Sequence, residues 1–373
     1  MKRVKRRMVR EKQRAQVELR EGLEMRYRRI LSRDDALAAL VVAAGAAKEP
    51  FHRWLSYRQG FSPGLVRRFL DEARLPEGPV LDPFSGSGTV VTECAVRGRT
   101  GIGSDVVRSL LLQARARFLA PPAPWNDLDL GDSIEKLWSL AADPGQRTAV
   151  LLAAAETVDG QGRPRKSALG GAERVGRFTS RMQEDLRHPP RGSGFLIRSD
   201  ARHIPLADEC VAGIITSPPY LSRYDYAAVN KPMETLLGPG QSAGTQLRAA
   251  RATAGGKTRR VHPAAEEAAG LLAKQGDVAG ARAIRGYFED MTRFIQEAFR
   301  LLKPGGPAWI IVGGADFNRE YIPSDLILAE IAKRTGFELE TLVEARRLRP
   351  QGRMLGGIPN VAPRESLLGL RRP

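Results

Sequence analysis

The stretch Val80-Leu81-Asp82-Pro83-Phe84-Ser85-Gly86-Ser87-Gly88-Thr89 decides the fold. A short apolar run is typical of a buried strand, and it leads through a carboxylate and a Gly-x-Gly turn into a plausible helix over residues 89–96. Strand, glycine turn and helix together let a ligand lie against bare backbone at a helix N-terminus, although a tight turn without a ligand fits equally well. The carboxylate disfavours a phosphate as the bound group.

Two further predicted strands also end in a carboxylate. Residues 100–105 predict a strand that ends at Asp105, where a carboxylate can accept hydrogen bonds from ribose hydroxyls. Residues 195–200 predict a strand that ends at Asp200, and residues 211–216 predict a buried strand that leads into Ser217. We therefore expect a doubly wound α/β sheet with these side chains where its strands end.

The C-terminal part predicts the rest of the sheet. The apolar period of residues 284–302 predicts a long helix that stops at Lys303-Pro304-Gly305-Gly306, and residues 308–313 predict another buried strand. Residues 337–347 and 366–370 predict two final strands, which suit an antiparallel edge pair.

The composition points to an intracellular protein with a polyanionic partner. The chain of 373 residues carries a net charge of +17, which attracts nucleic acid above all, although a basic proteome or a solubility device would also explain it. Two cysteines and no Cys/His cluster with ligand spacing argue against disulfides and a metal site. No apolar run approaches the length that spans a membrane, so we expect no membrane partner.

Basic residues concentrate in three segments. Residues 1–50 are expected to form a basic helical extension, either a clamp on a phosphate backbone or a solvated tail, ahead of one domain over 51–373. Insertions at about 121–193 and 238–283 break the regular pattern, and residues 160–177 are predicted as an exposed basic loop. Substrate contacts often lie in such insertions.

Ser217-Pro218-Pro219-Tyr220 is the second informative motif. Two prolines restrict the backbone and leave carbonyls pointing in set directions, beside a hydroxyl and an aromatic ring. This arrangement suits a planar group with an exocyclic amine, which would donate to Ser217 and to the Pro218 carbonyl while its ring stacks on Tyr220. Two acceptors would favour a pyramidal nitrogen whose lone pair can attack. A Pro-Pro turn without a chemical role is equally compatible with the tetrapeptide alone.

Taken together, the two motifs resemble those of the S-adenosylmethionine (AdoMet)-dependent amino-methyltransferases of DNA. That family carries Asp-Pro-Phe-x-Gly-Ser-Gly-Thr as its cofactor motif and Ser/Asp/Asn-Pro-Pro-Tyr/Phe/Trp as its catalytic motif, and the likeness runs from about Phe51 to the C-terminus. The resemblance implies a Rossmann-like α/β fold with a mostly parallel seven-stranded sheet, an antiparallel last strand and helices on both faces.

The resemblance also implies roles for individual residues. AdoMet would be the cofactor, contacted by Phe61, Asp82, Pro83, Phe84, Ser85, Gly86, Ser87, Gly88, Thr89, Asp105 and Asp200. Within this set, Asp105 would hold the ribose hydroxyls and Asp200 the adenine amine. Ser217, Pro218, Pro219 and Tyr220 would hold a flipped-out target base, and methyl transfer would be direct.

We therefore expect a site-specific DNA methyltransferase, with Ser217 favouring cytosine N4 over adenine N6 as the target. The alternatives are an RNA base amino-methyltransferase acting on guanine N2 or adenine N6, and a catalytically inactive DNA-binding relative. DNA is the expected partner, bound through the basic N-terminus and the basic insertions, in a prokaryotic cytoplasm at the nucleoid. The sequence identifies neither the target site nor a restriction endonuclease partner.

Overall fold

The computed structural model describes residues 18–54, 60–125, 128–129, 131–159, 162–166, 169–221, 226–238, 261–317, 320–348 and 363–373. The helices are α2 (Glu18–Tyr27), α3 (Leu37–Leu40), η1 (Ala43–Lys48), α4 (Pro63–Glu72), α5 (Thr89–Val96), α6 (Arg108–Arg115), η2 (Ala116–Phe118), α7 (Ile134–Leu140), α8 (Pro144–Ala155), α9 (Gly171–Asp185), α10 (Tyr226–Leu236), α12 (Pro263–Lys274), α13 (Val278–Leu301) and α14 (Ser324–Thr335). The strands are β1 (Leu31–Arg33), β2 (Val80–Asp82), β3 (Gly101–Asp105), β4 (Gly194–Arg198), β5 (Gly213–Thr216), β6 (Pro307–Gly313), β7 (Ala315–Phe317), β8 (Glu320–Ile322), β9 (Glu338–Arg347) and β10 (Arg364–Arg371).

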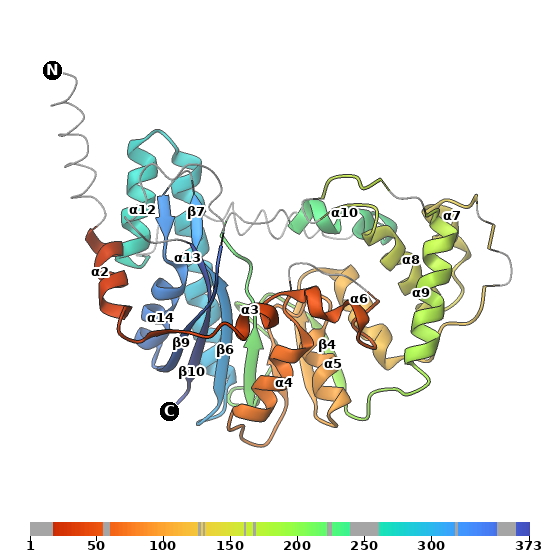
Figure 1. Cartoon of the computed structure of the whole chain (residues 1–373), viewed down its shortest axis with the longest axis horizontal. Helices are drawn as coiled ribbons and strands as arrows, with labels where there is room; N and C mark the ends of the chain where they lie inside the picture. The colour runs from red at the N-terminus through yellow and green to blue at the C-terminus, as the bar shows by residue number, and fades with distance from the viewer. Residues whose placement is uncertain are drawn as a thin grey trace.

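The main sheet has the strand order β1-β9-β10-β6-β5-β2-β3-β4 (Figure 1). Strand β10 is antiparallel to both of its neighbours, β6 and β9, whereas the other pairings in this sheet are parallel. The predicted fold class is confirmed, including the antiparallel insertion of the last strand. The sheet has one strand more than the seven predicted, because Leu31–Arg33 pairs with β9.

Successive residues of the central strands face two separate apolar cores. Leu81 and Ile214 pack into the core that contains α13 and α14, whereas Val80 and Ile215 pack into the core that contains α4. All four side chains are fully buried. Because a shift by one residue would exchange the two faces, this burial holds the strands in register.

The insertion between β3 and β4 contains a helical unit of α7, α8 and α9 at one end of the molecule (Figure 1). Leu137, Val150 and Phe178 form part of its own apolar core. The predicted exposed loop over residues 160–177 is therefore wrong from Gly171 onward, where α9 begins. The apolar residues of α9 recur with a helical period between its arginines, and they are buried. This buried apolar face makes the segment a helix.

A buried carboxylate ties this helical unit to the chain ahead of α4. Asp185, at the end of α9, accepts hydrogen bonds from the Phe51 backbone amide and the Trp54 indole, both at 2.7 Å. Arg53 forms an ion pair with the same carboxylate at 2.5 Å. Residues 51–54 are thereby held against the helical unit.

The N-terminal extension is not purely helical. Helix α2 lies within the predicted helical extension over residues 1–50, but strand β1 follows it and joins the sheet. Arg20 of α2 is fully buried and pairs with Glu267 at 2.7 Å and Glu320 at 3.1 Å, so this arginine is not available to a phosphate backbone. Residues 1–17 lie outside the described residues. The domain boundary at residue 50 stays a prediction.

The second predicted insertion, residues 238–283, is described only in its later part. Residues 239–260 lie outside the described residues, whereas α12 and the start of α13 form a packed helical pair. Ala265, Ala268 and Leu272 of α12 are fully buried in the large core. The part of this insertion from residue 263 onward is thus built into the domain.

Candidate active site

Four of the predicted site residues lie at one edge of the sheet. Asp82 ends β2, Asp105 ends β3, Asp200 follows β4 and Ser217 follows β5. These strands are adjacent and parallel, so their carboxyl ends meet. The fold therefore places the predicted cofactor residues and the predicted catalytic loop at the same edge.

The turn after β2 is organised by two carboxylates. The Phe84 amide donates to Asp82 at 3.1 Å, and the Gly86 amide donates to Asp105 at 2.8 Å. Gly86 has φ 48°, in the left-handed region that favours glycine. Asp105 also accepts from the Val107 amide at 2.9 Å, and burial raises its pKa. Asp105 thus orients the glycine turn as well as ending its own strand.

Gly88 is required by both its conformation and its surroundings. It has φ 81° and stands immediately before Thr89, the first residue of α5. A Cβ atom at this position would lie 2.5 Å from the Cβ atom of Ala114 on α6. The close approach brings the N-terminal amides of α5 to the turn, where they can face a ligand.

Arg117 connects the glycine turn to residues 51–54. Its guanidinium donates to the Ser87 carbonyl at 2.6 Å and to the Phe51 carbonyl at 3.0 Å, and lies 5.4 Å from the Trp54 ring centroid. Burial lowers the pKa of Arg117 to about 10. Arg117 is thus buried inside the molecule and supports the site.

Asp82 is a buried acid that links the two motifs. Its side chain accepts a hydrogen bond of 2.6 Å from the hydroxyl of Thr216, the residue immediately before Ser217. Burial raises the pKa of Asp82 to about 7. The glycine turn and the Ser-Pro-Pro-Tyr loop are therefore joined by one direct contact.

Asp200 is engaged by a neighbouring arginine. Arg202 contacts both carboxylate oxygens, at 2.9 and 2.6 Å, and pairs on its other side with Asp290 of α13 at 2.5 Å. Burial raises the pKa of Asp200, but the contacts with Arg202 outweigh it and hold that pKa below its ordinary value. A ligand amine at Asp200 would share this carboxylate with Arg202.

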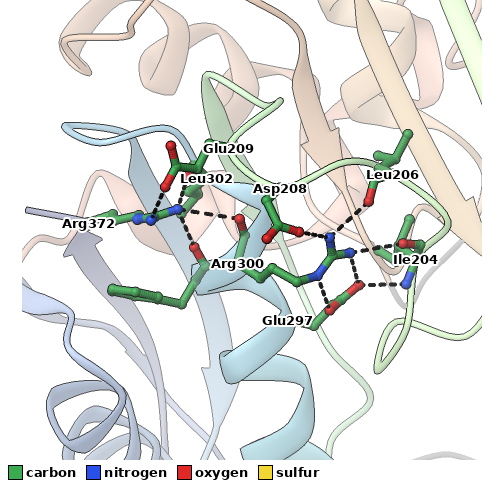
Figure 2. A network of polar contacts seen from close by, with 9 residues as sticks. Ile204, Leu206, Asp208, Glu209, Glu297, Arg300, Leu302 and Arg372 are labelled. Carbon is green, nitrogen blue, oxygen red and sulfur yellow. Dashed lines mark hydrogen bonds and ion pairs between the residues drawn. The ribbon is translucent and has the colours of Figure 1, made fainter.

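The loop that carries Asp200 is anchored to the end of α13 (Figure 2). Glu297 accepts a hydrogen bond of 2.7 Å from the Ile204 amide and pairs with Arg300. Arg300 in turn donates to the carbonyls of Ile204 at 3.1 Å and Leu206 at 2.9 Å. These contacts hold the loop after β4 in a defined position.

The catalytic loop contacts the C-terminal hairpin. The Tyr220 hydroxyl lies 3.3 Å from the Ser217 hydroxyl and donates to Glu365 of β10 at 2.5 Å. Arg346 of β9 pairs with the other oxygen of Glu365, also at 2.5 Å. Pro218 is buried, whereas Ser217, Pro219 and Tyr220 are half-buried. Chain segments far apart in sequence thus support the tetrapeptide.

Phe61 is a core residue in the structure. It is buried in the same apolar core as Leu65 and Val343. Its contact with a cofactor stays a prediction. The neighbouring residues 55–59 lie outside the described residues.

Sequence reasoning missed the residues that support the site: Thr216, Arg117, Arg202 and Glu365. Arg202 stands two positions after Asp200, so an Asp-x-Arg pattern could have indicated the pair. Thr216 immediately precedes the motif. Glu365 is separated from Tyr220 by 145 positions and carries no local signal.

The residues of the turn fit the AdoMet that the sequence resemblance implies. The Ser85 hydroxyl is buried and has no hydrogen-bond partner within the described residues, so it can serve a ligand. Asp82 and Asp105 supply acidic groups beside the backbone of Gly86 and Gly88, which suits a cationic nucleoside without phosphate. We expect the turn to hold the methionine and sugar, and Asp200 to hold the adenine amine.

The described residues contain no group of three or more His, Cys, Asp and Glu side chains that could hold a metal ion. Among the helices of that same part of the chain, none is long and apolar enough to cross a membrane.

A family model for the RMKL-like methyltransferase domain matches residues 62–269, more than half of the chain. Among curated proteins, the chain is 26% identical to the type II methyltransferase M.AvaI, found in Nostoc sp. and in Anabaena variabilis, over 87% of this chain and 86% of the relative. It is 33% identical to the type II methyltransferase M.BsoBI from Geobacillus stearothermophilus over 87 residues, which are 23% of this chain and 17% of that protein.

Solved structures include an AdoMet-dependent methyltransferase from Methanosarcina mazei, at 10% identity and a TM-score of 0.35, covering 83% of this chain and 96% of that one. TrmN from Thermus thermophilus is similar at 17% identity and a TM-score of 0.32, covering 83% of this chain and 48% of that one. At these TM-scores the likeness carries no argument of its own.

Proposed function

The chain belongs to the family of RMKL-like methyltransferase domains, and from this premise we propose that it methylates the exocyclic amine of a base in DNA. AdoMet supplies the methyl group. The relatives named as type II methyltransferases and the net charge of +17 support DNA as the substrate.

The hydrogen bond between Asp82 and Thr216 carries this proposal. It joins Asp82, at the start of the cofactor turn, to the residue before Ser217, and the two residues stand on adjacent strands of the sheet. A methyl donor held at the turn would therefore stand beside a base held at the Ser-Pro-Pro-Tyr loop. Proximity and orientation of the two reactants are the main requirement of a direct transfer.

The target amine would donate its hydrogens to the Ser217 hydroxyl and the Pro218 carbonyl. Its nitrogen would then turn its lone pair toward the methyl group, because two acceptors hold it in a pyramidal shape. Tyr220 would stack on the flipped-out base. The proton released from the amine passes to water, and Pro219 keeps the loop rigid.

We propose cytosine N4 as the target in preference to adenine N6, because the tetrapeptide begins with Ser217. Base discrimination and site recognition would come from the two insertions, residues 121–193 and 238–283. Modification at a defined DNA site would take place in the cytoplasm, at the nucleoid.

Expression in a methylation-free bacterial host, followed by long-read sequencing of its DNA, tests this function. We expect N4-methylcytosine at one short sequence motif. Ser217→Ala should reduce the modified fraction at least about 100-fold, because one of two amine acceptors is lost. Thr341→Ala, which removes an exposed hydroxyl on β9 outside both insertions, is the matched control.

Incubation of the purified protein with labelled AdoMet and either DNA, tRNA or rRNA distinguishes the possible substrates. Label in DNA with none in tRNA or rRNA supports the proposal, whereas label in RNA alone would make the protein an RNA methyltransferase. Binding of DNA without any methyl transfer would identify an inactive relative. N6-methyladenine at the mapped sites would retain the function and change the target base.

A further inference from the structure

Glu365 is a buried carboxylate that, within the described residues, binds one side chain from the neighbouring strand β9 and one from the Ser-Pro-Pro-Tyr loop. It lies directly across from Arg346 in the β9–β10 pairing and from Gly313 in the β6–β10 pairing. Arg346 binds one oxygen, and the Tyr220 hydroxyl donates to the other, each at 2.5 Å. Only about 3% of Glu365 is exposed, so these contacts are largely shielded from water.

Gly313 allows Tyr220 to reach this carboxylate. A Cβ atom at Gly313 would lie 2.9 Å from the Tyr220 ring. The ring therefore rests on the end of β6, beside the strand that carries Glu365. The position of the phenol is set by three strands of the sheet and not by its own loop alone.

The protons in this chain of contacts can be counted. A carboxylate paired with a guanidinium only accepts hydrogen bonds, so the single hydroxyl proton of Tyr220 points to Glu365. The contact of 3.3 Å between the Ser217 and Tyr220 hydroxyls then requires Ser217 to donate. Within the part of the chain that the structure describes, no donor is directed at the Ser217 oxygen, so both of its lone pairs can accept.

We propose that Glu365 is a positioning residue that makes Ser217 a hydrogen-bond acceptor for the target amine. Arg346 orients Glu365, Glu365 takes the Tyr220 proton, and Tyr220 takes the Ser217 proton. This inference rests on the proposed function, because it assigns the direction of hydrogen bonds at the Ser-Pro-Pro-Tyr loop. The antiparallel hairpin, remote in sequence, thereby sets the chemistry of the loop.

Glu365→Gln tests the direction of the chain. Its amide oxygen would face Arg346 and its amide nitrogen would donate to Tyr220, so Tyr220 would donate to Ser217 and occupy one of its lone pairs. We expect kcat to fall by about 10- to 100-fold. The dissociation constant of AdoMet and the KM for DNA should stay within about twofold, because neither ligand touches Glu365.

A double-mutant cycle with Tyr220→Phe separates positioning from a general structural role. Without the Tyr220 hydroxyl, Glu365 no longer acts on Ser217, so adding Glu365→Gln should reduce kcat no further. Glu344→Gln is the control, because it removes one ion pair, with Arg347, from the same hairpin without touching Tyr220. It should keep the wild-type kcat.

The outcomes distinguish the inference from the proposed function. If the wild type is active and Glu365→Gln has the same kcat, the inference is wrong and the proposed function stands. The same holds if the reduction in kcat of the double variant equals the product of the reductions in the two single variants. A wild type that methylates no DNA would overturn both. Thermal unfolding of the wild type and of every variant identifies a variant that loses activity because it fails to fold. Tyr220→Phe alone should still lower kcat.

Discussion

Asp82 is an acid whose charge depends on pH near neutrality, because burial raises its pKa to about 7. Its folded pKa lies above the unfolded value, so the protonated form is favoured in the unliganded fold. That contribution to stability is lost as the pH rises through about 7. A cationic ligand beside Asp82 reverses the preference and favours the ionised form.

We therefore predict that the affinity for AdoMet increases as the pH rises. Relative to Asp82→Asn, which lacks the charge, the wild-type affinity should increase about tenfold between about pH 6 and about pH 8. Isothermal titration calorimetry at both pH values measures this ratio. Asp71→Asn, a change at an exposed ion pair with Arg97, should behave as the wild type. A ratio independent of pH would contradict the prediction.

At the scale of elements, two arginines make contacts at the end of α13 (Figure 2). Arg300 binds the loop after β4, whereas Arg372 donates to the carbonyls of Phe299 and Leu302 at the end of the helix. Cationic groups at a helix C-terminus satisfy carbonyls that lack partners within the helix. Arg372 therefore stabilises the end of α13, whereas Arg300 anchors the loop after β4.

We predict different effects for the two truncations. Arg300→Ala should lower the free energy of unfolding by about 1–3 kcal/mol and weaken AdoMet binding by about three- to tenfold, because the loop that carries Asp200 loses its anchor. Arg372→Ala should lower stability by a similar amount and leave AdoMet binding unchanged. Urea unfolding and calorimetry measure both quantities. Equal AdoMet affinities in the two variants would contradict the proposed anchoring role.

At the scale of the whole molecule, the helical insertion contacts α10, the helix that follows the catalytic loop in the chain. Gly162 approaches Ala228 of α10 so closely that a Cβ atom there would lie 2.5 Å from the Ala228 side chain, and α10 follows the loop in the chain. The neighbouring Arg165 and Lys166 are exposed. The opposite end of the insertion leads into the amino end of β4.

We predict that Arg165→Ala/Lys166→Ala weakens DNA binding. The slope of the logarithm of the binding constant against the logarithm of the salt concentration should become less steep by about 2. The control is Arg187→Ala/Arg191→Ala, which removes two exposed cations before β4 and should leave the salt dependence unchanged. Fluorescence anisotropy over a range of salt concentrations measures both. An equal effect of the two pairs would place the DNA elsewhere on the molecule.

Much of the fold follows from local sequence, because strand patterns, glycine turns and helix stops act between neighbours in the chain. The apolar run before Asp82, the Gly-x-Gly turn at Gly86 and Gly88, and the end of the long helix before Lys303 all appear where the pattern predicts them. Helix α9 was partly missed because its arginines obscured a buried apolar face. Strand β1 was missed because three residues carry too little pattern.

The sequence by itself determined the two motifs and the sheet edge where they meet, since both motifs directly follow predicted parallel strands. Only the tertiary structure decided what supports them. Arg117 reaches the glycine turn from η2, directly after α6, and Glu365 reaches Tyr220 from a strand 145 positions away. Such contacts form only after the sheet has assembled, because burial of a charged group requires partners that packing brings together.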